Sequence, residues 1–332
     1  MPRFSFLARA SNPFVLSIAL AMGAVAAMPA RAAFPDKPVK IVVPFAPGGG
    51  TDLVARTMGI TMGQELGQPV IIDNKPGAGT LIGTDAVAKS PADGYTLVMA
   101  TVAHVVNPSI HNKMPYDHEK AFAPVMLVGV SPNVLVVRAE SPLKSVKDLI
   151  DAAKANPGRL SFASQGAGTS AHLAGELFKN LTKTNITHIP YRGAGPAITD
   201  VLGGQVDVMF ATAAAVGTFI EGGKLRALAV TTATRSPTPS LAKVPTIAES
   251  GVPGYVADSW YGLYAPAGTP ADVIAKLNAA AKKAVQTDAF KKRVESEGLI
   301  INGGSPQDFD RYAKGEEARW RKVVKENNIT ND

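Results

Sequence analysis

The stretch "VPFAPGGGTD" at residues 43–52 decides how the chain folds. It continues a β-branched run that starts at Val39 and predicts a buried strand. Three glycines then lead into an amphipathic segment that opens with Thr51 and Asp52. Thr is a preferred N-cap residue, so we predict that Thr51 caps a helix. A strand, a glycine loop and a helix N-terminus in this order favour anion binding, because unpaired N–H groups and the helix dipole point at the loop.

The same layout occurs again in the second half of the chain. "GRLSFAS" (158–164) predicts a strand and "QGAGTS" (165–170) a glycine loop, with Thr169 or Ser170 as the N-cap of the next helix. Each half continues with a second strand, a "GAG" loop, a helix and a third strand. Strands alternating with helices predict an α/β fold of mostly parallel sheets with helices on both faces. Two such units side by side would place four helix N-termini around one cleft, a site for a carboxylate or a phosphate.

The order of these segments predicts two lobes joined by two crossings of the chain. Lobe 1 is expected to comprise residues 33–133 and 256–332, and lobe 2 residues 134–255. The crossings near 133 and 257 would form a hinge.

Residues 1–32 have the pattern of a secretory signal peptide. Two arginines precede an apolar run at 13–28, and "ARA" (30–32) supplies a small-x-small cleavage pattern. An uncleaved membrane anchor is the alternative, and so short an apolar run fits it less well. We therefore expect export to the periplasm, with cleavage near Ala32-Ala33.

Composition argues against several classes of site and partner. The chain has no cysteine, which excludes disulfides, thiolate metal ligands and cysteine nucleophiles. The formal net charge of +7 falls by three if the arginines of residues 1–32 are removed. The remaining cations are mixed with acids in runs such as "FKKRVESEG", which is typical of a solvated helix face. We expect no nucleic-acid partner and no cofactor.

The glycine loops match no motif of nucleotide or nucleophile chemistry. "PGGGTD" lacks the Lys-Ser/Thr pair that follows the last glycine of a P-loop. "GAGTLIG" (77–83) has three residues between its last two glycines, where the dinucleotide fingerprint has two. No G-x-S-x-G nucleophile elbow is present. These departures argue against nucleotide hydrolysis, a nicotinamide enzyme and an α/β-hydrolase elbow.

Histidines suggest two further alternatives. His104, His111 and His118 lie seven residues apart in a stretch expected to be a loop. They are interpreted as solvated loop histidines and not as metal ligands, since their spacing matches no ligand pattern. Ser170 with His172 would suit an exported hydrolase, but a histidine near the start of a core-facing helix is more typical of packing or capping.

Seven stretches between about residues 34 and 270 carry a resemblance to a known family. They are "FPDKPVKIVVPFAPGGGTD", "VIIDNKPGAGT", "SPADGYTLVMA", "FASQGAGTSAHLAGELF", "HIPYRGAGPAITDVLGGQVDVMF", "VPTIAESGVPGY" and "WYGLYAPAGTP". Together they resemble the Bug-type receptors, the extracytoplasmic solute-binding proteins of tripartite tricarboxylate transporters. The resemblance implies a two-lobed periplasmic binding-protein fold of type II (Venus flytrap) that closes on a carboxylate. It also implies delivery to the integral membrane subunits of a secondary transporter, without catalytic residues.

The resemblance also implies which residues form the cleft. Loops 46–52 and 165–170 would clamp one carboxylate, and the segments 192–195 and 258–260 would complete the site. Phe45 is expected to lie against the body of the ligand, and the aromatic pair that follows Ser259 to pack in the core or hinge. The expected ligand-binding residues are Phe45, Ala46, Gly48, Gly49, Thr51, Asp52, Gly79, Thr80, His104, Gln165, Gly168, Thr169, Ser170, Arg192, Gly193, Ala194 and Asp258.

Some of these residues have a structural alternative. Thr51 and Thr169 can serve as N-caps, as ligand contacts or as both. Arg192 can pair with a ligand carboxylate or with an acid such as Asp200. Asp258 would repel an anion, so it either binds an ammonium group or latches the hinge, and the latch is favoured.

The sequence thus predicts a periplasmic receptor and not an enzyme. Its ligand would be a dicarboxylate, a tricarboxylate, an acidic amino acid or an aromatic acid, held between the lobes and handed to a membrane transporter. One alternative is a ligand sensor for a membrane signalling kinase, which the same closed lobes would serve. The other is the exported hydrolase.

Overall fold

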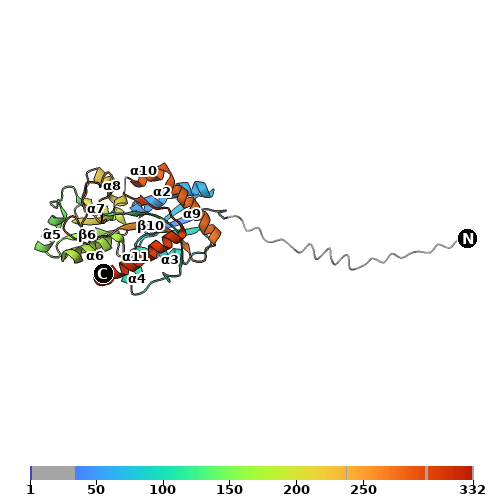
Figure 1. Cartoon of the computed structure of the whole chain (residues 1–332), viewed down its shortest axis with the longest axis horizontal. Coiled ribbons are helices and arrows are strands. Elements are labelled where there is room, and N and C mark those ends of the chain that lie inside the picture. The colour runs from blue at the N-terminus through green and yellow to red at the C-terminus, as the bar shows by residue number, and fades with distance from the viewer. Residues whose placement is uncertain (2–33, 237, 296–297, 331–332) are drawn as a thin grey trace. The chain divides into compact units, whose positions relative to one another are not determined.

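The computed structural model describes Met1 and residues 34–236, 238–295 and 298–330. The chain divides into two units, Met1–Asp36 and Lys37–Asp332. Apart from Met1, the predicted signal peptide and its cleavage site lie outside the described residues. The second unit contains every element discussed below (Figure 1).

One mixed sheet has six strands in the order β11-β4-β10-β3-β1-β2. In it β1 pairs in parallel with β2 and β3, while β10 runs antiparallel to β3 and β4, and β11 antiparallel to β4. We call it the first sheet. Its strands are β1 (Val39–Val43), β2 (Val70–Asn74), β3 (Thr96–Ala100), β4 (Phe122–Ser131), β10 (Ser259–Pro266) and β11 (Ile300–Ile301). The helical segments of the same part of the chain are α2 (Gly50–Leu66), η1 (Ala78–Thr80), α3 (Leu81–Ala88), α4 (Ala103–Ile110), α9 (Ala271–Gln286), α10 (Asp288–Glu295) and α11 (Pro306–Glu326).

The second sheet has five strands in the order β7-β6-β8-β5-β9. Here β6 pairs in parallel with β7 and β8, and β5 is antiparallel to β8 and β9. Its strands are β5 (Asn133–Arg138), β6 (Ser161–Ser164), β7 (Thr187–Pro190), β8 (Val208–Thr212) and β9 (Leu225–Val230). Its helices are α5 (Val146–Ala155), α6 (Ser170–Thr182), α7 (Ala194–Leu202) and α8 (Ala213–Glu221).

The doubled unit expected from the sequence is present in both sheets. In each unit the first strand lies between the second and the third, as β2-β1-β3 and as β7-β6-β8. The α/β fold is therefore confirmed, but the expectation of mostly parallel sheets is wrong. The strands that connect the two halves, β5 and β10, run antiparallel to these triplets, because each enters its sheet from the other one.

Side-chain alternation explains why helices cover both faces of the second sheet. Val208 and Phe210 of β8 pack in one core with α6, and Met209 and Ala211 pack in another with α7 and α8. Successive strand residues point to opposite faces, so a fully buried strand requires a helical layer on each side. All five residues of β8 are buried.

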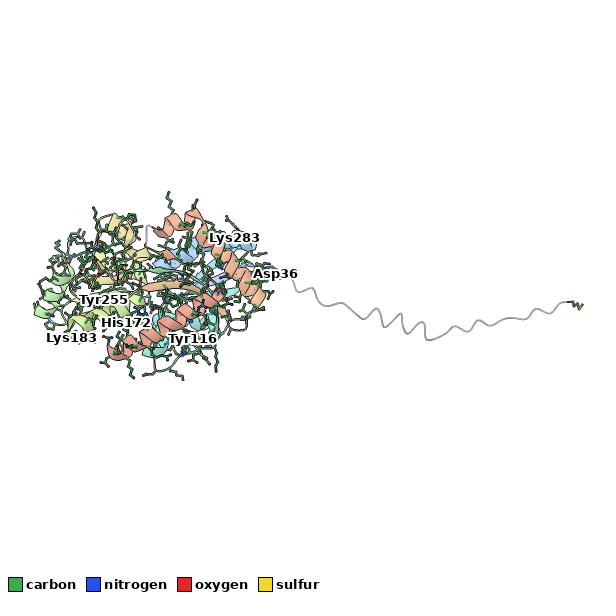
Figure 2. All side chains as sticks on the ribbon, viewed as in Figure 1. Asp36, Tyr116, His172, Lys183, Tyr255 and Lys283 are labelled. Atoms are coloured by element: carbon green, nitrogen blue, oxygen red, sulfur yellow. The ribbon has the colours of Figure 1, made fainter. Side chains whose placement is uncertain are left out.

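The two crossings of the chain meet in a buried hydrogen-bond network. The side-chain amide of Asn133 donates to the carbonyl of Ala257 (2.9 Å), and the Thr231 hydroxyl donates to the Asn133 carbonyl (3.0 Å). Nearby, the hydroxyl of Tyr255 donates to the Ala174 carbonyl of α6 (2.7 Å; Figure 2). The chain thus passes between the sheets near the positions expected from the sequence, while the lobe boundaries and the hinge stay predictions.

The segment between β3 and β5 differs from the expected loop. It contains α4 and the ten-residue strand β4, which pairs with β10 and β11. Pro108 inside α4 and Pro124 and Gly129 inside β4 weaken the local pattern that would announce these elements. In the described part of the chain no helix combines the length and apolarity needed to cross a bilayer.

Candidate binding site

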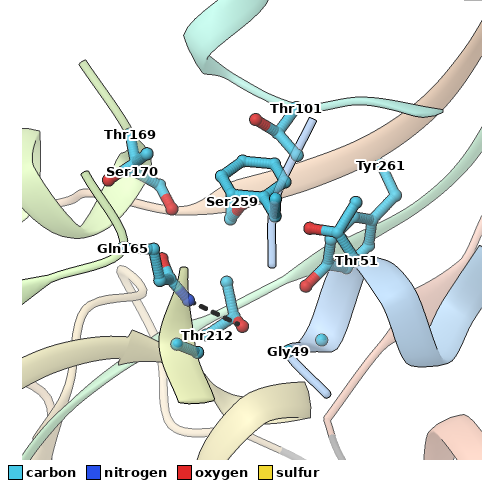
Figure 3. Close-up of a pocket in the computed structure, with 12 residues that line it drawn as sticks. Gly49, Thr51, Thr101, Gln165, Thr169, Ser170, Thr212, Ser259 and Tyr261 are labelled. Carbon is cyan, nitrogen blue, oxygen red and sulfur yellow. Dashed lines mark hydrogen bonds between the residues drawn. The ribbon is translucent and has the colours of Figure 1, made fainter. Parts of the chain in front are cut away.

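A small cavity, which we call the inner cavity, lies where elements of both sheets meet (Figure 3). Its volume is about 10 Å³, close to what a single water requires. No charged side chain is among the residues that line it. They are Phe45, Gly49, Gly50, Thr51, Thr101, Ser259 and Tyr261 from the first sheet's side, and Gln165, Thr169, Ser170, Ala194 and Thr212 from the second sheet's side.

Four helix N-termini converge on the inner cavity. Gly50, Ser170 and Ala194 are the first residues of α2, α6 and α7, and Thr212 is the N-cap of α8. Each terminus offers unpaired N–H groups and about half a positive charge. The sequence predicted four such termini but included α3, whose N-cap Thr80 lies instead at a neighbouring cavity. The site is therefore electropositive without a cationic side chain.

The loop between β1 and α2 contradicts the predicted cap. The N-cap is Gly49, without a side-chain hydrogen bond, and α2 already begins at Gly50. A Cβ at Gly50 would lie 2.8 Å from the Tyr261 hydroxyl oxygen and 2.9 Å from Thr212 Oγ1, so only glycine fits there. Thr51 is therefore a helix residue that lines the cavity, and not a cap.

Asp52 lies behind this loop and does not line the cavity. Its carboxylate accepts hydrogen bonds from the Gly48 N–H (3.0 Å), the Arg56 guanidinium (3.0 Å) and the Asn74 amide (2.9 Å). Burial alone would raise the pKa of Asp52, but these three donors outweigh it and lower the pKa. The same Asn74 amide donates to the carbonyl of Phe45 (3.1 Å). The structure thus makes Asp52 the anchor of the loop, and its assignment as a direct ligand residue stays a prediction that the position of its carboxylate does not favour.

The loop between β6 and α6 is held by neutral groups. Of the two predicted candidates, Thr169 is the N-cap: its hydroxyl accepts from the His172 N–H (3.4 Å) and donates to the Gly166 carbonyl (2.7 Å). The N–H of Gly168 donates to Nδ1 of His172 (3.1 Å). Ser170 donates through its hydroxyl to Asn133 (3.1 Å) at the crossing. The hydroxyls of Thr169 and Ser170 therefore both form hydrogen bonds that stabilise the loop.

His172 is a packed histidine, as favoured from the sequence. It is 1% exposed and stacks on His188, with ring centroids 4.3 Å apart. Burial lowers the pKa of His172 to about 4, with a further contribution from Lys179, and lowers that of His188 to about 3. His188 in turn lies 2.7 Å from the hydroxyl of Ser164. Because the Ser170 hydroxyl bonds Asn133 and not His172, the hydrolase dyad is not formed.

The two sheets' loops touch each other directly around the inner cavity. The N–H of Ala46 donates to the carbonyl of Arg192 (3.0 Å), and a Cβ at Gly193 would lie 3.0 Å from that same nitrogen. On the other side, a Cβ at Gly79 would lie 2.4 Å from the carbonyl oxygen of Ala167. Glycine at these positions lets the backbones meet, so the described arrangement is a closed one.

A second cavity of about 190 Å³, which we call the outer cavity, adjoins the inner one. Phe45 and Gln165 line both. Gly79, Thr80 and Arg192, predicted as ligand residues, lie here. The full lining is Pro44, Phe45, Gly77, Ala78, Gly79, Thr80, Gln165, Gly166, Ala167, Pro190, Tyr191 and Arg192.

The alternative ion pair of Arg192 is not formed in the described part of the chain. Asp200 instead accepts a hydrogen bond from the Tyr191 hydroxyl (2.6 Å). Partial burial and Asp200 raise the pKa of Tyr191 to about 12, so that hydroxyl keeps its proton at neutral pH.

His104 lies in a different environment from the one predicted. It belongs to α4, is 8% exposed and stacks on Tyr264 with ring centroids 4.5 Å apart. Burial lowers its pKa to about 4, with a contribution from His118. It lines a third cavity beside α11 and neither the inner nor the outer one. The interpretation of His104 as a solvated loop histidine is therefore wrong, and its contact with the ligand stays a prediction that its position at the third cavity does not favour. Among the described residues no group of three or more His, Cys, Asp or Glu is arranged to hold a metal.

Asp258 also lines neither the inner nor the outer cavity. Burial raises its pKa to about 6, and the charges that act on it are those of Arg319 and Glu316 in α11. Arg319 donates to the neighbouring carbonyl of Val256 (3.2 Å). The assignment of Asp258 to the ligand site and its role as a latch both stay predictions, and its surroundings favour the latch.

Five cavity residues are absent from the list of expected ligand-binding residues: Gly50, Thr101, Thr212, Ser259 and Tyr261. Gly50 and Ser259 nevertheless fall within the segments 46–52 and 258–260 that were expected to form the cleft. Thr101 and Thr212 stand at the carboxyl ends of the parallel strands β3 and β8, where ligands of α/β sheets bind, and that rule could have found them. Ser259 and Tyr261 alternate on β10; Ser259 lies in the segment expected to complete the site, whereas Tyr261 was expected only to pack in the core or hinge.

Comparisons with known proteins agree with this geometry. The model of the tripartite tricarboxylate transporter family receptor matches residues 54–329. Protein BugT of Bordetella pertussis is 39% identical over 314 residues, 94% of this chain and 96% of BugT.

Two solved structures are similar along nearly their whole length. The periplasmic binding protein BugD has a TM-score of 0.86 at 34% identity, covering 90% of this chain and 99% of BugD. Rpa4515 of R. palustris with adipate has a TM-score of 0.85 at 39% identity, covering 90% of this chain and 99% of Rpa4515. The α/β architecture is thus the two-lobed periplasmic binding-protein fold, the lobes being built on the first and second sheets. The chain belongs to the tripartite tricarboxylate transporter receptor family, as a Bug-type solute-binding receptor and not an enzyme.

Proposed function

We propose that this receptor captures a small carboxylate in the inner cavity and delivers it to an integral membrane transporter. The observation that carries the proposal is the convergence of four helix N-termini on one cavity with no charged side chain. Neutral N–H groups and hydroxyls suit a carboxylate, because they donate to its oxygens and the helix dipoles favour its charge. A cationic ligand would be repelled by the same dipoles.

Capture requires the lobes to move, since the closed inner cavity has room for about one water. The ligand would enter when the Ala46–Arg192 hydrogen bond and the contact of Gly79 with Ala167 are separated. It would then bridge the loops that open α2 and α6. A ligand that contacts both lobes only in the closed form stabilises that form by its differential affinity. The membrane partner would recognise the closed receptor.

The relatives support the class of ligand and the location. Rpa4515 is described with adipate, a dicarboxylate, and BugD is described as a periplasmic binding protein. The family description names a tripartite transporter for tricarboxylates. For this chain we propose export, cleavage near Ala32-Ala33 and a role in the periplasm. Mass spectrometry of the exported protein tests the cleavage, because a mature N-terminus far from Ala33 would contradict it.

A thermal-shift screen tests the function directly. The protein is unfolded and refolded to remove any co-purified ligand, and is then heated with di- and tricarboxylates, acidic amino acids, aromatic acids and sugar acids. A ligand at a hundredfold its Kd stabilises the folded protein by roughly 2.7 kcal/mol, which raises the midpoint by several degrees. A shift confined to carboxylates is expected. No shift with any acid would refute the proposal.

A matched pair of glycine variants places the binding in the inner cavity. Gly49→Val adds a Cβ and two methyl groups. The new Cβ alone would lie 3.5 Å from the Cβ of Ala194, so the methyl groups extend into the cavity's remaining space. The φ of −85° at this position is one that valine tolerates. This variant should lose the ligand-induced shift and keep its fold. Gly315→Val in α11, where a Cβ meets nothing within 4 Å, is the control and should keep the shift. Equal shifts in both variants would locate the ligand elsewhere.

A further inference from the structure

Asp258 is a partly buried acid at the second crossing of the chain, one residue before β10. Its Oδ1 atom is buried and accepts no hydrogen bond from the described residues. The preceding residue, Ala257, is tied to the second sheet: its N–H donates to the Thr231 carbonyl (2.9 Å), and its carbonyl accepts from the amide of Asn133 (2.9 Å). The following residue, Ser259, already belongs to the first sheet. A carboxylate with one unpaired oxygen thus lies where one lobe passes into the other.

The charges around Asp258 contain one acid too many. Arg319 of α11 acts on Asp258, but its guanidinium forms an ion pair with Glu316 (2.9 Å) and donates to the Val256 carbonyl (3.2 Å). The second oxygen of Glu316 accepts from the indole N–H of Trp320 (3.2 Å). One cation therefore serves two acids, and Asp258 is the less satisfied of them. Burial raises the pKa of Asp258 to about 6; the charge of Arg319 opposes this rise, and that of Glu316 adds to it.

Two tyrosines complete the surroundings of Asp258. Tyr312 belongs to α11, and Tyr255 to the segment that leaves the second sheet. Burial raises the pKa of both phenols, and the charge of Asp258 adds to the rise. Neither phenol therefore takes up or releases a proton between pH 5 and pH 7.

Contacts between the two lobes hold this joint shut. The Tyr255 hydroxyl donates to the Ala174 carbonyl of α6 (2.7 Å), and the amide of Asn180, also in α6, donates to the carbonyl of Asn327 at the end of α11 (3.3 Å). Because α6 belongs to the second lobe and α11 to the first, separation of the lobes would draw these elements apart. Water would then reach Asp258 between them.

We propose that Asp258 is a proton-binding site coupled to closure: the closing lobes remove its carboxylate from water, and the closed receptor takes up a proton there. This inference rests on the proposed function, because the bound carboxylate ligand is what drives closure. In the open receptor the hydrated carboxylate has a pKa near its ordinary value of 3.8, whereas burial in the closed form raises the pKa to about 6. Between these two values the closed form binds more protons than the open form, so acid favours closure and tightens ligand binding.

Calorimetric titration of the unmodified protein and of Asp258→Asn between pH 7 and pH 5 tests this coupling. The probe is adipate or, if adipate does not bind, the acid that gives the largest shift in the thermal screen. The ligand's own titration is common to both proteins and cancels in the ratio of their affinities. Because the amide cannot take up a proton, the affinity of the unmodified protein relative to the variant should rise about tenfold from pH 7 to pH 5.

Two further variants guard this comparison. Asp151→Asn removes an acid from the exposed pair with Lys147 and should keep the pH dependence of the unmodified protein. Asp258→Ser also lacks a titratable group, so it repeats the test if Asp258→Asn fails to fold. Affinities that run parallel with pH in the unmodified protein and the Asp258 variants would overturn the coupling and leave carboxylate capture intact. Failure of every acid of the screen to bind would refute both proposals together.

The same titrations also count protons. At pH 6, measurements in buffers of different ionisation heat give the number of protons taken up on binding. The unmodified protein should take up about half a proton more than Asp258→Asn, since Asp258 is then half protonated in the closed form and ionised in the open form. Equal proton counts would overturn the assignment of the site to Asp258.

Discussion

The two loops that precede α2 and α6 have similar sequences but are stabilised by different kinds of interaction. The first, Gly48 to Asp52, depends on an ionised carboxylate that gathers a backbone N–H, a guanidinium and an amide. The second, Gln165 to Ser170, depends on a hydroxyl cap and on a neutral imidazole that accepts the Gly168 N–H. A glycine-rich pattern thus specifies a backbone shape but leaves open the groups that hold it. The two sides of one site consequently differ in their response to mutation and to acid.

The largest effect on ligand affinity is expected at Gly79, where a glycine from the first lobe contacts the second loop. Gly79→Ala places a Cβ 2.4 Å from the Ala167 carbonyl of the second loop and should prevent closure, lowering ligand affinity by about a hundredfold or more. Gly67→Ala has nearly the same positive φ (69° against 59°) but nothing within 4 Å, so it carries the backbone strain without the clash. Titration calorimetry of both variants isolates the effect on closure. If both bind as the unmodified protein does, closure does not depend on this contact.

Acid should weaken the second loop before the first. The pKa of His172 is lowered to about 4, below the ordinary value of 6.5, so the folded state prefers neutral imidazole. That contribution is complete above pH 6.5 and is lost as the pH falls towards 4, because only the unfolded chain takes up the proton there. The loss amounts to roughly 3 kcal/mol for this group. Asp52, whose pKa is lowered below 3.8, keeps its contribution until the pH falls through that value.

Denaturant unfolding of the unmodified protein and of His172→Phe across pH 4 to 7 measures this difference. The phenyl ring keeps the stacking on His188 and cannot titrate. The variant should start less stable at pH 7 by roughly 1–3 kcal/mol, because the Gly168 N–H loses its acceptor. Its stability should then fall less steeply with acid, by up to about 1.4 kcal/mol per pH unit. Parallel pH profiles would show that His172 does not titrate in this range.

The anchor of the first loop should matter less for stability, since part of its network is exposed. Asp52→Asn keeps the volume but removes the charge that three donors share, and we expect a loss of roughly 2 kcal/mol in the free energy of unfolding. Asp151→Asn removes an acid from an exposed pair with Lys147 and should cost less than about 0.5 kcal/mol. A loss for Asp52→Asn no larger than that of Asp151→Asn would argue against the anchor.

The smallest change in stability is expected from a comparison of Thr169 with Thr51. Thr169→Val removes an N-cap hydroxyl and should lower the free energy of unfolding by about 1 kcal/mol. Thr51→Val makes the same isosteric change at a residue that caps nothing, and should change stability much less. Urea unfolding of the two variants without ligand is the measurement. Equal losses would contradict the assignment of Gly49 as the first cap.

The sequence predicts the local elements of this fold better than the features that depend on contacts between residues far apart in the chain. The runs of β-branched residues, the glycine loops and the Thr169 cap all depend on neighbours within a few positions, and the structure contains them. The start of α2 depends on Tyr261 and Thr212, more than 150 residues away, which leave no room for a side chain at Gly50. Thr51, one position later, is consequently a residue type that favours N-caps at a position that is not the N-cap.

The same limit applies to the site residues. His104 was expected at the ligand from the family resemblance, yet it stacks on Tyr264 from the distant strand β10. Asp52 has the sequence position of a ligand contact, but Asn74 and Arg56 turn its carboxylate towards the loop itself. Which way a polar side chain points is decided by tertiary partners, and periodicity contains no information about them.

The tightness of the inner cavity has a consequence for the timing of transport. A ligand enclosed between the lobes cannot depart while the loops that close the inner cavity are in contact, because the closed cavity leaves no opening wide enough for it. Its residence time is then set by how often the lobes open, a motion of microseconds to milliseconds in proteins of this kind, and not by the strength of its own contacts alone. A membrane partner that pulls the Ala46–Arg192 contact apart would accelerate unloading without competing for the ligand.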